Sequence, residues 1–317
     1  MRILSRPALT PHRTAANLTA WFVLPTGSGP DPDSGPDYAV LEEALDRKEA
    51  VLHETGNVNE LVIENLGDAD LFIQAGDLVK GGRQDRTLGA DFIVPARSGR
   101  VPIPAFCVES GRWSRRRGES EFQFSKSSDM ASSKKLRALL RTRGNQGAVW
   151  ESVAEMQQKL GHGVQADATS GLSPSSLQLS VEKREVVVAV EDYLRQLGAP
   201  PDPAAMGVVW AINGRLSHAD VYASPVVFRK VWRKLLRAAA LEALGERSGG
   251  RVPADPDPAA VTAWLATPAA AAASEEPLPP RTRITTRRMG SRLHSETVDL
   301  VDRAAPVPVH VSVLETA

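Results

Sequence analysis

Short runs in which hydrophobic and polar residues alternate fill much of residues 1–125, and this period of two predicts β-strands. Five or six such runs are expected to form strands, with turn-forming pairs such as Gly56-Asn57 between them. The expected strands lie at residues 15–25, at three places within 51–77, at 90–96 and at 100–110. Many short strands separated by turns are typical of an antiparallel β-sandwich or partial barrel.

Two prolines limit where the last of these strands, at residues 100–110, can lie in a sheet. Pro102 and Pro104 lack backbone N–H groups, and because they are two residues apart both missing donors fall on one side of the strand. The strand is therefore expected at a sheet edge or beside a bulge.

After residue 126 the apolar positions recur every three or four residues, which predicts amphipathic helices. The clearest helix begins at Ser224-Pro225, a cap residue followed by a proline in the first turn. Residues 161–180 are polar and rich in turn formers, so a connection without regular structure is expected there. Including one near the N-terminus, helices are expected at residues 38–50, 127–143, 148–161, 181–198 and 225–245.

The order of strands, then helices, then strands predicts an α+β protein. Asn213-Gly214 is the strongest short hairpin signal, because both residues accept the positive φ angles of a two-residue turn. The expected parts are a β-rich body at 1–125, a helical part at 126–250 with a β-hairpin at 206–222, an Ala/Pro-rich linker at 251–280, and C-terminal strands at 281–317 that rejoin the body.

Composition narrows the class of protein. The 317 residues are 42% hydrophobic and 24% charged, which is ordinary for a globular protein. The single cysteine excludes an internal disulfide and a cysteine-based structural zinc site, so a reducing compartment fits best. No apolar run is long enough for a signal-peptide core or a membrane span. A cytoplasmic protein without a membrane partner is expected.

The formal net charge is zero, but the charges are unevenly distributed. Residues 31–70 carry twelve acidic against two basic residues, whereas residues 112–143 carry ten basic against three acidic ones. The two segments could neutralise each other in the fold, or the basic one could form a patch for phosphate or nucleic acid. Overall neutrality makes a nucleic-acid partner the less favoured interpretation.

The segment 75–86 could cradle a phosphate. Gly81 and Gly82 would let backbone N–H groups point at an anion, and Lys80, Arg83 and Arg86 supply positive charge. The alternative is a glycine turn between strands with solvated charges beside it.

A second group of candidates follows closely. Cys107, Glu109 and Arg112 place a thiol, a carboxylate and a guanidinium within six residues, and Trp113 next to Arg112 could stack on a planar ligand. Cys107 could equally be a buried structural residue, because free cysteine is among the most buried residue types. With no HExxH motif and no Rossmann fingerprint, neither a metal nor a cofactor is expected.

Two long blocks, 76–113 and 213–244, resemble the ARG and rhodanese-phosphatase-superfamily-associated protein domain. The resemblance implies an association with ADP-ribosyl-glycohydrolase-like and rhodanese or phosphatase proteins rather than a particular reaction. This chain departs from the family pattern at Asp77, Asp85 and Phe106, which weakens any role for those two carboxylates. Mapped on the family, the polar positions are Lys80, Gln84, Arg86, Cys107, Glu109, Arg112 and Trp113 in the first block, and Asn213, Gly214 and Asp220 in the second.

Three functions remain open. The first is an accessory module that binds a phosphorylated or nucleotide-like ligand, with ADP-ribose derivatives suggested by the family association. Its expected contacts are Lys80, Gly81, Gly82, Gln84, Arg86, Arg112, Trp113, Asn213 and Asp220. The second is a hydrolase or transferase that uses Cys107 or Glu109 as the catalytic group beside Arg112. The third is a protein-interaction scaffold without a small-molecule site.

Overall fold

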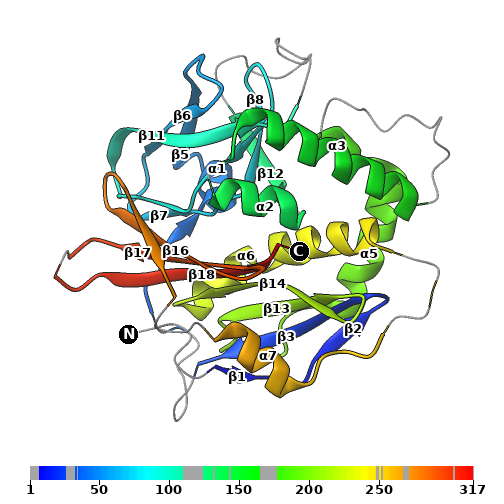
Figure 1. Ribbon diagram of the computed structural model, residues 1–317. Coiled ribbons are helices and arrows are strands. Elements are labelled where there is room, and N and C mark those ends of the chain that lie inside the picture. The colour runs from blue at the N-terminus through cyan, green and yellow to red at the C-terminus, as the bar shows by residue number, and fades with distance from the viewer. Residues whose placement is uncertain are drawn as a thin grey trace. The chain divides into compact units, whose positions relative to one another are not determined.

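The computed structural model describes residues 7–25, 33, 35–109, 124–130, 133–142, 144–164, 177–247, 250, 253–266, 271–302 and 304–316 (Figure 1). The chain forms two compact units. We call residues 38–190 the inserted unit, and residues 1–37 together with 191–317 the terminal unit.

The terminal unit is built on a nine-stranded antiparallel sheet in the order β1-β3-β13-β14-β18-β17-β16-β15, with β2 also paired to β3. Its strands are β1 (Ala8–Leu9), β2 (Arg13–Ala15), β3 (Leu18–Leu24), β13 (Gly207–Ile212), β14 (Arg215–Tyr222), β15 (Ala273–Leu278), β16 (Thr282–Met289), β17 (Arg292–Asp299) and β18 (Val307–Glu315). Because β3 pairs with β13, the first strand expected from the sequence, at residues 15–25, joins the hairpin near residue 210 rather than the strands of the inserted unit. The compact units therefore do not follow the expected boundary near residue 125.

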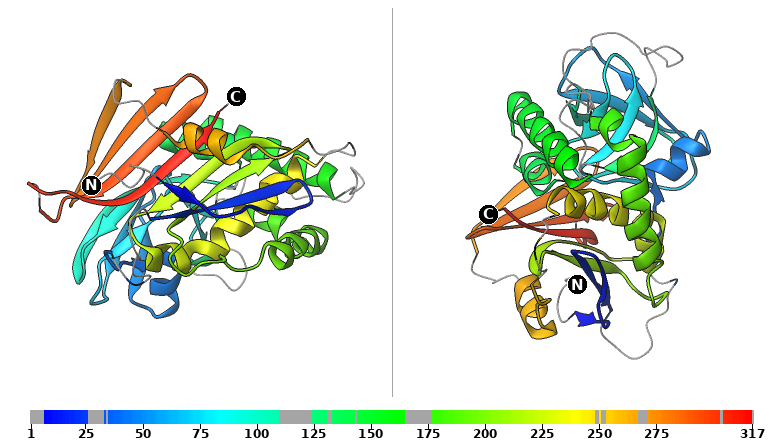
Figure 2. Two further views of the ribbon diagram at one scale, coloured as in Figure 1. Left: turned by 90° about the horizontal axis from the view of Figure 1, so that it is seen from below. Right: turned by 90° about the vertical axis from the view of Figure 1, so that its right-hand side faces the viewer.

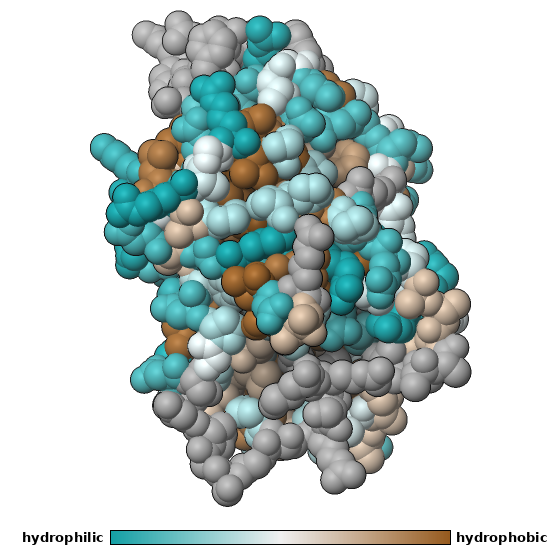
Figure 3. Space-filling view, turned by 90° about the vertical axis from the view of Figure 1, so that its left-hand side faces the viewer, coloured by the Kyte–Doolittle hydropathy of each residue, from teal (hydrophilic) through white to brown (hydrophobic). Residues whose placement is uncertain are grey.

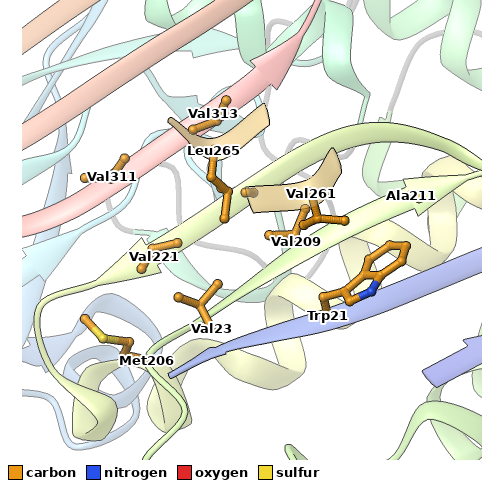
Figure 4. Close-up of a cluster of buried hydrophobic side chains, with 11 residues drawn as sticks. Trp21, Val23, Met206, Val209, Ala211, Val221, Val261, Leu265, Val311 and Val313 are labelled. Atoms are coloured by element: carbon orange, nitrogen blue, oxygen red, sulfur yellow. The ribbon is translucent and has the colours of Figure 1, made fainter. Parts of the chain in front are cut away.

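Two helices cover opposite faces of this sheet (Figures 1 and 2). On one face, Val261 and Leu265 of α7 (Pro258–Leu265) pack with buried residues of β3, β13, β14 and β18, as Figure 4 shows. On the other face, Trp232 of α6 (Pro225–Gly245) stacks on Trp210 with ring centroids 5.7 Å apart. Each large apolar side chain buried in this way contributes about 1.5–3 kcal/mol. Both faces of the sheet are thus fixed by helices.

The predicted hairpin and the predicted long helix are both present. Asn213 and Gly214 have φ values of 52° and 70°, the turn geometry that the pair favours. The Ser224 hydroxyl accepts a hydrogen bond from the backbone N–H of Val227, and Pro225 stands in the first turn of α6. Local sequence signals were sufficient for these two elements.

The inserted unit contains a three-stranded sheet, β10-β7-β4, and a six-stranded sheet, β12-β8-β9-β11-β6-β5. Its strands are β4 (Ala39–Val40), β5 (Ala50–Glu54), β6 (Glu60–Asn65), β7 (Leu71–Ile73), β8 (Asp77–Gly81), β9 (Arg86–Leu88), β10 (Phe92–Val94), β11 (Ser98–Cys107) and β12 (Phe124–Met130). Apart from β4 and β7, which are parallel, neighbouring strands are antiparallel. The edge strands β12 and β5 also contact each other, so the six-stranded sheet curls into a nearly closed partial barrel.

The prolines of β11 lie where this strand has one open side. At Val101–Pro104 it pairs only with β6, and its pairing with β9 begins at Ala105. A register shift between Ser98 and Val101 marks a bulge. The prediction from the two prolines is confirmed, because their missing N–H groups remove no ladder hydrogen bond to β9.

The remaining helices are α1 (Leu41–Asp46), α2 (Lys134–Arg141), α3 (Gln146–Gly163), α4 (Leu177–Val181) and α5 (Arg184–Leu197), and α5 runs from the inserted unit into the terminal unit. Helix α4 lies in the stretch expected to be irregular. Likewise, α7 and β15 lie within 251–280, where a linker was expected. Asp257 caps α7 and Pro258 begins it, a start signal that the Ala/Pro-rich composition obscured.

The architecture confirms the α+β class with a partial barrel. None of the helices in the described part of the chain combines the length and apolar character that crossing a bilayer requires.

Candidate functional site

One end of the barrel interior is polar. Strand register places apolar side chains on the concave face of the six-stranded sheet, among them Leu52, Leu61 and Ile103. The same face ends in Glu54 on β5 and in Arg86 and Cys107 on β9 and β11. Because β5 and β9 are not neighbours in the sheet, the ion pair between Glu54 and Arg86 must cross the barrel interior.

Arg86 is the centre of this polar end, with a side chain that is 1% exposed. Its Nη2 donates to both carboxylate oxygens of Glu54, at 3.0 and 3.2 Å. Its Nη1 donates to the backbone carbonyl of Val58 at 2.9 Å and to the sulfur of Cys107. A charge buried this deeply must be paired, and Glu54 supplies the counter-charge.

Cys107 is fully buried, and its S–H group donates to Oε1 of Gln84 at 2.8 Å. Burial raises the pKa of the thiol to about 11, and the carboxylates of Glu54 and Glu109 add to the rise, while Arg86 acts in the opposite direction. The thiol is therefore protonated at neutral pH, and a protonated thiol is a poor nucleophile. The burial of Cys107 therefore favours a structural role over a catalytic one.

Gln84 links Cys107 to Glu109. The Gln84 amide donates from Nε2 to the backbone carbonyl of Glu109 at 3.0 Å, and the backbone N–H of Asp85 donates to the Glu109 carboxylate at 3.3 Å. The structure thus brings together four residues predicted from the sequence: Gln84, Arg86, Cys107 and Glu109. It also adds Gln146 from α3, whose side-chain amide bonds both the N–H and the carbonyl of Cys107, at 2.9 and 2.8 Å.

The glycine turn lies at the same end of the barrel. Gly81 and Gly82 have φ values of 121° and 57°, and the N–H of Gly81 donates to the Asp85 carboxylate at 3.3 Å. A Cβ added at Gly82 would lie 3.0 Å from Oε2 of Glu54 and 2.6 Å from Cζ of Phe124. Only glycine allows the chain to approach the Glu54 carboxylate so closely.

Other predicted residues make contacts elsewhere. Lys80 forms an ion pair with Glu182, on the chain just after α4. Arg112 and Trp113 lie outside the described residues.

Asn213 and Asp220 belong to the terminal unit and bond within it. Asn213 donates to the carbonyl of Glu246 at 2.9 Å. The Asp220 carboxylate lies 3.1 Å from Nε2 of His310, with both side chains fully buried, and Tyr222 stacks on the imidazole. The structure therefore gives both residues contacts that stabilise the β13–β14 hairpin and its neighbours.

Glu54 and Gln146 were missed by sequence reasoning. Glu54 offered one weak signal, as a carboxylate at the end of an alternating run in the acidic segment. Gln146 offered none, because a helix N-terminus gives no indication of the strand it packs on. Among the described residues, no group of three or more His, Cys, Asp or Glu side chains is placed to hold a metal ion.

Comparisons with known proteins give one match. The search of curated proteins and the search of solved structures each found nothing similar. A family model does match residues 8–312, and it describes the ARG and Rhodanese-Phosphatase-superfamily-associated Protein domain, ARPP-1. That description names an association with another protein superfamily, which fits an accessory domain. As the sequence blocks at 76–113 and 213–244 predicted, the chain belongs to the ARPP-1 family.

Proposed function

We propose that this accessory domain binds a phosphorylated or nucleotide-like ligand at the polar end of the barrel in its inserted unit. ADP-ribose and its derivatives are the first class to test. The proposal covers Gly81, Gly82, Gln84 and Arg86, together with the sequence neighbours Arg112 and Trp113.

This proposal rests on one observation: a glycine turn with positive φ angles and the buried Arg86 lie at the same end of the barrel. Barrel ends are frequent ligand sites, and glycine turns let backbone N–H groups approach an anion. The basic residue Arg83 belongs to this turn, and Arg112 follows Glu109 by three residues in the sequence. Glu109, the last described residue before Arg112, bonds to Gln84 and Asp85 beside the turn.

Binding is favoured over thiol catalysis for a specific reason. A hydrolase or transferase that used Cys107 would need a thiolate, and the raised pKa of Cys107 opposes its formation. Glu109 remains the candidate acid or base of this alternative, but its carboxylate is buried and bonded to the backbone of Asp85.

The experiment is a thermal-shift panel with ADP-ribose, NAD, ADP, inorganic phosphate and short RNA. Each ligand is tested on wild type, Arg83→Gln and Arg112→Gln. A ligand at 100 times its Kd should add about 2.7 kcal/mol of stability, a shift of several degrees in Tm. Arg86 is unsuited to this test because its removal would leave Glu54 buried without a counter-charge.

Arg97→Gln is the matched control. Arg97 belongs to the same unit, and its side chain is 73% exposed, so its loss should change neither stability nor binding. A shift that disappears in Arg83→Gln and Arg112→Gln but persists in Arg97→Gln supports the proposal. If all variants respond like wild type, the ligand does not bind here.

A panel without any shift would favour the protein-interaction scaffold. The space-filling view shows hydrophobic side chains in several groups with hydrophilic ones between them (Figure 3). Among the described residues, the exposed large hydrophobic side chains are Leu66, Trp150, Leu179, Val188 and Val301. Single exposed apolar side chains are normal on protein surfaces and do not identify a docking site.

The proposal also places the protein in the cytoplasm, since its one cysteine fits a reducing compartment.

A further inference from the structure

The ion pair between Arg86 and Glu54 leaves one donor of the guanidinium unused. Both Glu54 oxygens are bonded by Nη2, and Nη1 is occupied by Val58 and Cys107. The neighbouring Nε–H group is buried and has no hydrogen-bond partner among the described residues. A buried donor without a partner is costly and rare, so it calls for an explanation.

Arginine binds oxyanions best through two parallel N–H groups, such as Nε–H and the adjacent Nη2–H. Two oxygens of one phosphate or carboxylate fit this pair of donors. Glu54 does not use the pair, because both of its oxygens share Nη2. Its Oε1 also accepts from the N–H of Gly56 at 3.3 Å, which ties the carboxylate to its own strand end.

The surroundings of the Glu54 carboxylate have the features of an anion site. Arg86 supplies the positive charge, Gly56 supplies a backbone N–H, and Gly82, which has no side chain, lets the backbone of the glycine turn approach Oε2. Every one of these features would serve a phosphate equally well. The anion that now occupies this site is the Glu54 carboxylate of the protein itself.

We infer that the Arg86 guanidinium binds the phosphoryl group of the ligand. While no ligand is bound, the Glu54 carboxylate occupies the guanidinium instead. The phosphoryl oxygens take Nε–H and Nη2–H together, and the Glu54 carboxylate moves away from the guanidinium. One anion replaces another, so the buried positive charge stays paired throughout. This inference rests on the proposed function in one respect, that the ligand carries a phosphoryl group.

A competition of this kind has a measurable consequence. If Glu54 and phosphate exclude each other from Arg86, removing the Glu54 charge must strengthen phosphate binding. If the ion pair only holds the barrel together, its removal destabilises the protein and gives phosphate no advantage.

The test compares wild type with Glu54→Gln in inorganic phosphate and in sodium chloride of equal ionic strength. Phosphate should raise the Tm of Glu54→Gln selectively, with an apparent Kd tighter than that of wild type by on the order of tenfold or more. Glu64→Gln is the matched control, because Glu64 is a carboxylate of the neighbouring strand β6 whose arginine partner is exposed. The double variant Glu54→Gln/Arg86→Met should lose the phosphate response.

A second measurement needs no variant and keeps the inference testable if Glu54→Gln does not fold. The Nε–H resonance of Arg86 in wild type, assigned through its covalent neighbours, should move as phosphate is added, because that N–H gains an acceptor. Chloride at the same ionic strength should leave it in place.

The outcomes separate this inference from the proposed function. An unmoved Arg86 resonance, or a Glu54→Gln variant that responds to phosphate no better than wild type, overturns the inference even if ADP-ribose binding depends on Arg83 and Arg112. A phosphate response gained in Glu54→Gln supports the inference even if the wild-type nucleotide panel is flat, and in that case the nucleotide part of the proposed function fails.

Discussion

The Cys107 thiol should ionise at a higher pH in the folded protein than in the unfolded chain. Burial raises its pKa from the ordinary value of 9.0 to about 11. At any pH below 9 the folded protein should therefore contain roughly a hundredfold less thiolate than the unfolded chain. Since this is the only cysteine in the sequence, a thiol reagent reports on this residue alone.

The same shift links stability to pH. The folded-state pKa is the higher one, so the contribution of the protonated thiol to stability is complete below pH 9 and is lost as the pH rises toward 11. Two pKa units correspond to a loss of about 2–3 kcal/mol at most. Because pH 10 lies midway between the two pKa values, urea unfolding at pH 8 and pH 10 should show wild type losing about half of this amount, roughly 1.4 kcal/mol, relative to Cys107→Ala.

Alkylation by iodoacetamide, followed by mass spectrometry from pH 7 to pH 10, provides the direct assay. In urea the rate should reach half of its maximum near pH 9 and level off by about pH 10, whereas in the folded protein it should still be rising about tenfold per pH unit at pH 10. The position of the plateau depends on the pKa and not on access, so slow reagent entry cannot imitate this result. A folded-state rate that levels off by pH 10, as it does in urea, would refute the assigned environment of Cys107 and favour the hydrolase or transferase alternative.

Three further predictions concern the free energy of unfolding, measured by urea titration. Gly82→Ala should cost about 1–3 kcal/mol more than Gly56→Ala, since both glycines have positive φ but only a Cβ at residue 82 meets other atoms within 4 Å; equal costs would contradict the close approach. Arg141→Met should cost about 3–5 kcal/mol, because it removes the positive charge 2.9 Å from the buried Asp91 carboxylate, whereas Arg97→Met at an exposed pair should cost less than about 1 kcal/mol. Tyr193→Phe should cost about 1–3 kcal/mol, because the buried Oδ1 of Asn17, 2.7 Å from the tyrosine hydroxyl, loses its hydrogen-bond donor. An unchanged stability would show that another donor replaces the hydroxyl.

Much of the local structure was readable from short-range signals. The turn at Asn213-Gly214, the start of α6 at Ser224-Pro225 and the open side of β11 all follow from the backbone preferences of the residues themselves. These preferences act within a few residues, so they survive in any fold that the chain adopts. The α+β class follows from the same signals added along the chain.

Pairing between distant segments was beyond such signals. Strand β3 lies beside β13, although almost 200 residues separate them in the sequence, and β15 forms within a stretch whose composition suggested a linker. Which strands become neighbours depends on how apolar faces are buried together, and many arrangements satisfy one pattern of alternation.

The candidate site shows the same division. The sequence by itself determined only that Gln84, Arg86, Cys107 and Glu109 lie within a few dozen residues of one another, whereas the pairing of β9 with β11 sets Arg86 beside Cys107. Only the tertiary structure decided that Glu54 from β5 faces Arg86, since that contact requires the six-stranded sheet to curl until non-neighbouring strands meet. Alternation along β11 could not show that Phe106 and Cys107, on opposite faces, are both buried. Burial depends on what packs against each face, and the sequence of one strand carries no information about its neighbours.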